Sequence, residues 1–438
     1  MFENISKNSC PCGKEHSFTS KILVEKGAIN RLPDMLFEMG IKSAFVIADK
    51  NTYSAAGEKV VEALKGSDIK TKKYVFEKEN LESNEENVGL AVMNFCPESD
   101  AVIGVGSGVI NDIGKIVANV SGKPYIIVGT APSMDGYASA SSSMTMEGLK
   151  ISLNSRCADV IIGDLDVLCH APIKMMLAGL GDMIAKYVSI CEWRISNLIN
   201  GEYYCENIAS LVRGALKKCA DNAEGLLQRN EDAVKAVFEG LIICGAAMKF
   251  AGLSRPASGT EHYLSHIWDM RSVEFGTPVE LHGIQCAVGT LIAVKLYETI
   301  KSIVPDREKA LNCVKSFEFS AWAEELRKFL GKGAQSMLAL EEKEQKYSIE
   351  KHGKRIDVII EKWNEILNII EDELPSFSEL ESLFINLGLP RSAKEIGLNE
   401  NIVPMTFKCA KDIRDKYVLP KLAWDLGITD ELFKKSET

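Results

Sequence analysis

The sequence lacks a hydrophobic run long enough to cross a lipid bilayer. Its most apolar long stretch, residues 241–253 (LIICGAAMKFAGL), is too short for a membrane-spanning helix and contains Lys249. The first ten residues, MFENISKNSC, have no apolar run after their first charges, so they do not match a secretory signal peptide. We therefore expect a cytoplasmic protein without membrane insertion.

Positively charged residues are also fewer than negatively charged ones. The chain has 51 Lys and Arg residues against 61 Asp and Glu residues, a formal net charge of -10, which argues against a nucleic-acid-binding surface. An acidic chain that binds phosphate groups must gather backbone N–H donors, single cations or a metal ion locally. The 12 cysteines, without a secretory pattern, predict reduced thiols.

Apolar runs and helical stretches divide the chain into two parts. Its 438 residues, without internal repeats or low-complexity tracts, suffice for two domains. Short apolar runs at residues 44–48, 101–105, 125–128 and 160–162 are separated by helical stretches, which predicts a parallel sheet covered on both faces. After about residue 172 the apolar residues have helical spacing. We predict an α/β nucleotide-binding domain over residues 1–170 and an all-α domain over residues 171–438.

A charged stretch near the C-terminus has its own pattern. Residues 341–373 carry apolar side chains at helical spacing, which predicts one long amphipathic helix ended by Pro375. The wider segment 341–399 could be an added helical layer or an oligomer contact. Its many charges favour a solvated helical face.

Two glycine- and hydroxyl-rich motifs follow predicted strands. Residues 104–115 (GVGSGVINDIGK) open a helix, where glycines let the backbone approach a pyrophosphate and the helix N-terminus supplies N–H donors. A tight turn without a ligand is the alternative. Residues 129–143 (GTAPSMDGYASASSS) offer hydroxyls for phosphates or sugars, although taken alone they match a polar surface loop equally well. Both motifs fall at the strand ends where such sheets bind ligands.

Acidic and imidazole side chains suggest a metal site. Asp182, in GLGDMIAK, is expected near the start of an apolar helix, as either an N-terminal cap or a metal ligand. Of only six histidines, His262 and His266 share one helical face and His282 follows shortly afterward. A carboxylate with two imidazoles binds a metal and leaves positions open for substrate. The spacing does not decide which two histidines are ligands.

The N-terminal string CPCGKEH could also bind a metal through Cys10, Cys12 and His16. No fourth ligand is evident from the sequence, so we favour a cysteine-rich strand or turn.

Taken in order, the strings GVGSGVIND, TAPSMDGYAS, GLGDMIAK, SRPASGTEHYLSH and LHGIQCAVG resemble the glycerol dehydrogenase, iron-alcohol dehydrogenase and dehydroquinate synthase superfamily. Within it, the chain is most similar to the bacterial branch of the sn-glycerol-1-phosphate dehydrogenases, which AKDIRDKYVLPKLAWDLG at residues 410–427 also resembles. The resemblance implies a dehydroquinate synthase-like fold. It also implies NAD(P)H-dependent reduction of dihydroxyacetone phosphate to sn-glycerol 1-phosphate, a step toward phospholipids.

The same resemblance implies a role for individual residues. Asp182, His262 and His282 match the ligands of one divalent metal, either zinc, nickel or iron. His266, Asp135 and Asp182 match both the catalytic residues and the substrate contacts. Arg255 is our candidate for the substrate phosphate, from its charge and position. The residues that match contacts to NAD(H) or NADP(H) are Asp49, Gly106, Ser107, Gly108, Asp112, Thr130, Ser133 and Ser139.

Two alternatives stay open. A glycerol dehydrogenase would use the same metal site on unphosphorylated glycerol or dihydroxyacetone, although SRPASGTEH resembles the branch that uses phosphate. The second alternative is a non-catalytic homologue that binds metal or nucleotide. The expected partners are a small-molecule substrate and further copies of this chain, as a homodimer or higher homo-oligomer.

Overall fold

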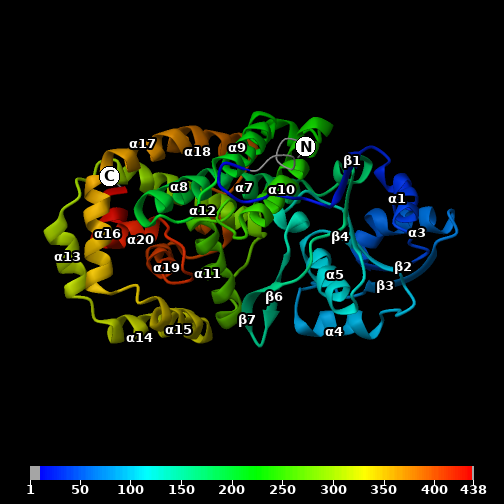
Figure 1. Ribbon diagram of the computed structural model, residues 1–438, viewed down its shortest axis with the longest axis horizontal. Helices are drawn as coiled ribbons and strands as arrows, with labels where there is room; N and C mark the ends of the chain where they lie inside the picture. Colours follow the sequence, from blue (N-terminus) through cyan, green and yellow to red (C-terminus); the bar gives the residue numbers. More distant parts are fainter. Residues whose placement is uncertain (1–9, 437–438) are drawn as a thin grey trace. The chain divides into compact units, whose positions relative to one another are not determined.

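The computed structural model describes residues 10–436, which form two compact units (Figure 1). The first unit contains residues 10–183 and 210–253, and the second contains residues 184–209 and 254–436. Residues 1–9, on which the prediction about a signal peptide largely rests, lie outside the described residues, as do 437–438. Within residues 10–436, no helix combines the length and the apolar character that crossing a membrane requires.

A parallel sheet is the centre of the first unit, as the apolar runs predict. Its six strands follow the order β1-β8-β5-β4-β2-β3, and every neighbouring pair is parallel. The carboxyl ends of these strands therefore share one edge, where both glycine-rich motifs begin. The strands are β1 (Lys21–Glu25), β2 (Ser43–Asp49), β3 (Lys70–Phe76), β4 (Ala101–Gly106), β5 (Tyr125–Gly129) and β8 (Val160–Asp164). A separate antiparallel hairpin contains β6 (Ser141–Met146) and β7 (Leu149–Asn154).

The sheet buries a different set of side chains on each face because strand residues alternate. On one face, Val46 and Ile103 belong to a core that includes Leu36 and Val60. The opposite face lies against α5, where a Cβ on Gly114 would come within 2.6 Å of the Tyr125 ring. Glycine thus allows close packing of α5 on the sheet. The helices of this part are α1 (Leu32–Glu38), α2 (Lys50–Thr52), α3 (Glu58–Lys65), α4 (Glu85–Met93) and α5 (Gly108–Ser121).

Among the described residues, no strand follows Asp164, which confirms the prediction of a helical remainder. The longer helices are α7 (Ile173–Ile184), α8 (Lys186–Asn200), α9 (Glu206–Asp221), α10 (Glu231–Ala251), α11 (Thr260–Phe275), α12 (His282–Ile300), α14 (Phe319–Leu330) and α16 (Ile349–Glu361). The shorter ones are α6 (Leu165–Leu168), α13 (Arg307–Lys315), α15 (Ala334–Glu344), α17 (Trp363–Glu373), α18 (Phe377–Leu387), α19 (Val403–Ala410), α20 (Leu419–Asp425) and α21 (Thr429–Ser436). The domain boundary at residue 170 stays a prediction.

The prediction of a single helix over residues 341–373 is wrong. The chain ends α15 with Gln345 in the left-handed conformation, at φ 51°, and Ser348 then caps α16 by accepting the Lys351 N–H. A second break at Lys362 separates α16 from α17. Apolar spacing continues across both breaks, but a capping serine stabilises a new helix start. As expected from Pro375, α17 ends at Glu373.

The hydrogen bonds of Lys115, which connect α5 to residues 136–141, can be tested by substitution. Its side chain is fully buried, and Nζ donates to the Gly136 carbonyl (2.6 Å), the Ser139 hydroxyl (3.0 Å) and the Ser141 carbonyl (3.0 Å). Lys115→Met would leave these acceptors without their donor, so we expect a loss of about 2–4 kcal/mol in unfolding free energy. Thermal unfolding measures it. Lys59→Met, at an exposed site on α3, is the control, and equal melting temperatures for the two variants would contradict the prediction.

Candidate functional site

The first motif forms a tight strand-to-helix turn at the carboxyl edge of the sheet. Gly106 ends β4, Ser107 precedes the helix, and α5 begins at Gly108. A Cβ on Gly106 would lie 2.5 Å from the Ile110 Cβ, so the turn requires glycine. The first N–H groups of α5 have no partner within the helix and carry its positive dipole end. Such N–H groups can bind a pyrophosphate, and the role of this turn in binding one stays a prediction.

The second motif lies beside the first. Thr130 donates its N–H to the Gly106 carbonyl at 3.1 Å, and the hydroxyls of Ser107 and Ser133 are hydrogen-bonded to each other. The Tyr137 hydroxyl donates to the Ala131 carbonyl at 2.6 Å and closes the loop. The structure therefore brings together Ser107, Thr130 and Ser133, three of the predicted nucleotide contacts.

Three other predicted cofactor residues have partners of their own. Ser139 accepts from Lys115, as described, and an Asp112 carboxylate oxygen lies 3.9 Å from the Lys115 Nζ. Burial raises the pKa of Asp112 to about 6. Asp49, at the end of β2, caps the short helix α2 by accepting the Thr52 N–H at 2.9 Å. These contacts position the loops, and none excludes a further contact with a nucleotide.

Asp182 lies in α7, two residues before its last residue, so its predicted place near a helix start is wrong, as is the N-cap alternative. The helix begins at Ile173, and Gly179 lies inside it, where a Cβ would overlap the Pro132 carbonyl oxygen. This close approach lets the fully buried Asp182 accept the Asp135 N–H at 2.9 Å. The carboxylates of Asp135 and Asp182 also lie close together, with an oxygen of one within 4.8 Å of an oxygen of the other.

Three imidazoles gather in the second unit, as predicted. His262 and His266 are on the same face of α11, and His282 is the first residue of α12. The ring centroids of His262 and His282 are 5.1 Å apart, those of His266 and His282 are 5.9 Å apart, and those of His262 and His266 are 6.4 Å apart.

Hydrogen bonds fix the tautomers of His262 and His282. The Nδ1 of His262 lies 2.7 Å from a Glu261 carboxylate oxygen, and the Nδ1 of His282 lies 3.1 Å from the Ser265 hydroxyl. Since Ser265 donates its hydrogen to Gln285 at 2.7 Å, its oxygen accepts from His282. Both rings then carry the proton on Nδ1 and present an unprotonated Nε2, as in a metal-ligating histidine. Glu261, Ser265 and Gln285 are not among the site residues predicted from the sequence.

Besides Glu261, a second buried carboxylate, that of Glu192, is hydrogen-bonded to the start of α11. Glu192, on α8, accepts the N–H groups of Thr260 at 2.9 Å and Leu419 at 2.8 Å. Glu261 accepts the Gly259 N–H at 2.7 Å. Burial, and then the neighbouring charge of Glu261, raise the pKa of Glu192 to about 7. Glycine at position 259 makes room, because a Cβ there would lie 2.5 Å from a Glu192 oxygen.

His266 and Cys286 differ from the two hydrogen-bonded imidazoles. Burial, and then the charge of Arg414, hold the pKa of His266 well below its usual value, so its ring is neutral near pH 7. The Cys286 sulfur lies 3.5 Å from the His282 Nε2 and adds a soft donor to the cluster.

A basic cavity of about 440 Å³ lies in the second unit and contains Arg255. The Arg255 guanidinium donates through Nε to Glu202 (2.7 Å) and through a terminal nitrogen to the Tyr417 carbonyl (2.7 Å). Most N–H groups of Arg255 are thus hydrogen-bonded within the protein, and the binding of a substrate phosphate by Arg255 stays a prediction. The half-buried Lys416 is another cation of this cavity, and burial lowers its pKa to about 7. The other basic residues that line it are Lys346, Lys351, Arg355, Lys411 and Lys421.

The hydrogen bond between Glu261 and His262 can be tested by metal binding alone. Glu261→Gln keeps an oxygen for the His262 Nδ1–H but removes the charge that makes the ring a strong ligand, so we expect roughly 10-fold weaker binding of Ni²⁺. Titration against a chromophoric chelator measures the affinity. Glu361→Gln, at an exposed position of α16, is the control. Unchanged affinity in Glu261→Gln would show that this hydrogen bond does not support a metal ligand.

Comparison with known proteins agrees with these features. A family model described as iron-containing alcohol dehydrogenase matches residues 23–172. Among solved structures, glycerol dehydrogenase from Schizosaccharomyces pombe aligns with a TM-score of 0.63 at 18% identity, covering 97% of this chain and 92% of that one. Sulfoacetaldehyde reductase from Bifidobacterium kashiwanohense, in complex with NAD+, aligns with a TM-score of 0.61 at 14% identity, covering 97% and 99%. These likenesses show the fold and confirm the predicted fold class.

Sequence relatives extend the likeness. The glycerol-1-phosphate dehydrogenase (NAD(P)+) of Methanosarcina acetivorans is 29% identical over 67% of this chain and 80% of its own length. The protein of that name from Halalkalibacterium halodurans is 32% identical over 417 residues, 94% of each chain. With that identity over nearly its whole length, the chain belongs to the glycerol-1-phosphate dehydrogenase family.

Proposed function

We propose that this protein reduces dihydroxyacetone phosphate to sn-glycerol 1-phosphate with NADH or NADPH as the hydride donor. The observation that carries the proposal is the imidazole cluster, in which the Nδ1 atoms of His262 and His282 are hydrogen-bonded to Glu261 and Ser265. This arrangement, in a member of this family, matches a metal-assisted dehydrogenase.

The carboxyl edge of the sheet is the proposed nucleotide site. The Gly106–Gly108 turn at the start of α5 would receive the pyrophosphate, and the hydroxyls of Ser107, Thr130 and Ser133 offer further donors. Asp49, at the end of β2, would meet the adenosine ribose, where a carboxylate favours NAD over NADP. Ser139 and Asp112 would support these loops through Lys115. The cofactor supplies the hydride.

Asp182, His262 and His282 are the residues that would hold one divalent metal. A carboxylate with two imidazole nitrogens accepts zinc, nickel or iron, so these residues fit the group. When bound, such an ion polarises a carbonyl as a Lewis acid. Asp182 belongs to the first unit, and His262 and His282 belong to the second.

Proton transfer is assigned to His266. Its neutral imidazole can give the ring N–H proton to the oxygen that gains charge during hydride transfer, while its other nitrogen takes a proton from solvent. Asp135, whose N–H is fixed by Asp182, is the proposed contact to a substrate hydroxyl.

The basic cavity is the proposed phosphate subsite. It lies in the same unit as the histidines, and the charge of Lys416 is one of those that lower the His266 pKa. A flexible ammonium group in a basic pocket suits a phosphate dianion. Arg255 stays the second candidate in this cavity.

The direct test is an assay of NADH and NADPH oxidation with dihydroxyacetone phosphate, using protein reloaded with zinc or nickel. We expect turnover, with sn-glycerol 1-phosphate identified as the product by chiral analysis. Turnover with dihydroxyacetone but not with its phosphate would instead make the protein a glycerol dehydrogenase. Absence of turnover with either substrate would favour a non-catalytic homologue.

A second test concerns Lys416. Loss of a charge-assisted hydrogen bond worth about 1.5–3 kcal/mol predicts that Lys416→Met raises the KM for dihydroxyacetone phosphate by roughly 10- to 100-fold. The KM for unphosphorylated dihydroxyacetone should not change. Because the lowered Lys416 pKa of about 7 means that its charge is lost as pH rises through that value, the wild-type KM for the phosphate should rise above about pH 7.

Two comparisons make the Lys416 test specific. Lys351→Met removes an exposed lysine of the same cavity and should leave both KM values unchanged. Arg255→Ala reports on the other candidate. If Arg255→Ala leaves the preference for the phosphorylated substrate unchanged, Arg255 is not the phosphate ligand. An unchanged preference in Lys416→Met would likewise show that Lys416 is not the phosphate ligand.

A further inference from the structure

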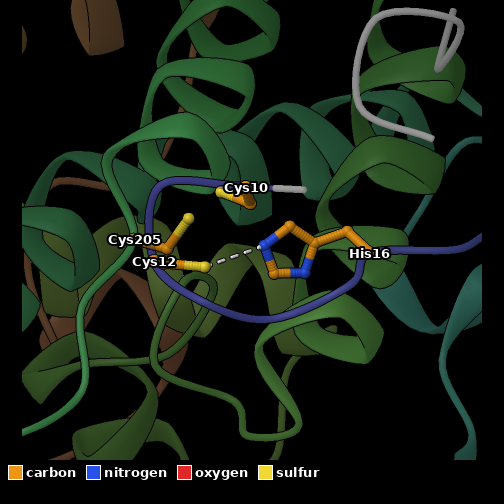
Figure 2. A group of neighbouring side chains, drawn as sticks. All are labelled: Cys10, Cys12, His16 and Cys205. Atoms are coloured by element: carbon orange, nitrogen blue, oxygen red, sulfur yellow. Dashed lines mark hydrogen bonds between the residues drawn. The ribbon is translucent and has the colours of Figure 1, made fainter. Parts of the chain in front are cut away.

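A short N-terminal loop brings two thiols and an imidazole together, apart from the histidine cluster. Gly13, at φ +80°, donates its N–H to the Cys10 carbonyl at 2.9 Å and reverses the chain after Cys12. The Cys12 sulfur then lies 3.2 Å from the His16 Nε2, with the two side chains pointing toward each other in Figure 2. Three side chains of types that bind zinc thus converge within seven residues of chain.

The loop is held in place by the end of α10. The His16 ring packs against Phe250 with the centroids 5.6 Å apart, and Lys14 donates to the Ala251 carbonyl at 3.5 Å. Cys10 is only 9% exposed and His16 only 4%. The ligand atoms of Cys10, Cys12 and His16 all lie within 4.8 Å of one another. The donors are therefore gathered and largely shielded from water before any ion binds.

The donor chemistry favours one class of ion. Two thiols and an imidazole are soft or borderline ligands, which select zinc over magnesium or calcium. A structural zinc site needs four such ligands. Figure 2 shows a fourth possible ligand in this group, the thiol of Cys205, which is 2% exposed and directly precedes α9.

We propose that Cys10, Cys12, His16 and Cys205 bind a structural zinc ion, distinct from the metal assigned to Asp182, His262 and His282. A closed set of three thiolates and one imidazole leaves no open position for substrate, so this ion would have no part in the chemical step. Each thiol gives up its proton on binding, so the affinity should rise with pH.

Metal content tests the proposal on the full-length protein. After reloading with Zn²⁺ and desalting, elemental analysis should give two ions per chain for the wild type. The double variant Cys10→Ser, Cys12→Ser should retain one, and so should Asp182→Asn, His282→Ala, which removes the other site. Cys96→Ser and Cys313→Ser, at half-buried thiols elsewhere, are matched controls that should retain two.

The cobalt spectrum of the wild-type protein gives a second readout, which identifies thiolate ligands without a variant. Co²⁺ bound by the proposed ligands should show intense thiolate charge-transfer absorption and tetrahedral ligand-field bands. These should persist in Cys286→Ser, which removes the thiol of the histidine cluster, and should be lost or much weakened in Cys205→Ser. One zinc per chain in the wild type, absence of thiolate absorption, or a Cys10–Cys12 disulfide in freshly purified protein would each overturn the proposal. Unchanged zinc affinity and cobalt spectrum in Cys205→Ser would overturn the four-ligand site.

Discussion

Two buried carboxylates at the start of α11 are the constraint on which the second unit's chemistry depends. Glu192 binds the N–H groups of Thr260 and Leu419, and so connects α8, α11 and the start of α20. Glu261 fixes the ring of His262. Burying two neighbouring acids is costly, as the raised pKa of Glu192 shows, and the hydrogen bonds they accept offset that cost. Without these acceptors, neither the helix start nor the imidazole would have a defined position.

In the first unit the corresponding constraint is close backbone approach. Gly106 allows β4 to turn into α5, and Gly179 allows α7 to contact Pro132. The second of these contacts places Asp182 beside Asp135. Side chains larger than hydrogen at these positions would separate the loops and carboxylates that the proposed reaction requires. The glycines of the two motifs therefore act through packing as much as through flexibility.

The sequence predicts most of this architecture because buried parallel strands are continuous apolar runs and helices have regular apolar spacing. It also predicts the gathering of His262, His266 and His282. It fails where contacts distant in the chain decide the outcome. The contact of Gly179 with Pro132 joins residues far apart in the chain, and the helix breaks at Gln345 and Lys362 interrupt no apolar pattern. Nor does any spacing reveal that Ser265 joins His282 to Gln285.

The proposed function depends most on a single ion bound by Asp182 and by the imidazoles of His262 and His282 in the tautomers described. Anomalous diffraction from crystals of nickel-loaded protein, collected on both sides of the nickel absorption edge, tests it most directly. We expect a peak coordinated by the Nε2 atoms of His262 and His282 and by the Asp182 carboxylate, with both Nδ1 hydrogen bonds retained. A peak bound through Nδ1, or through His266 in place of either ring, would contradict the account, as would an ion that lacks Asp182.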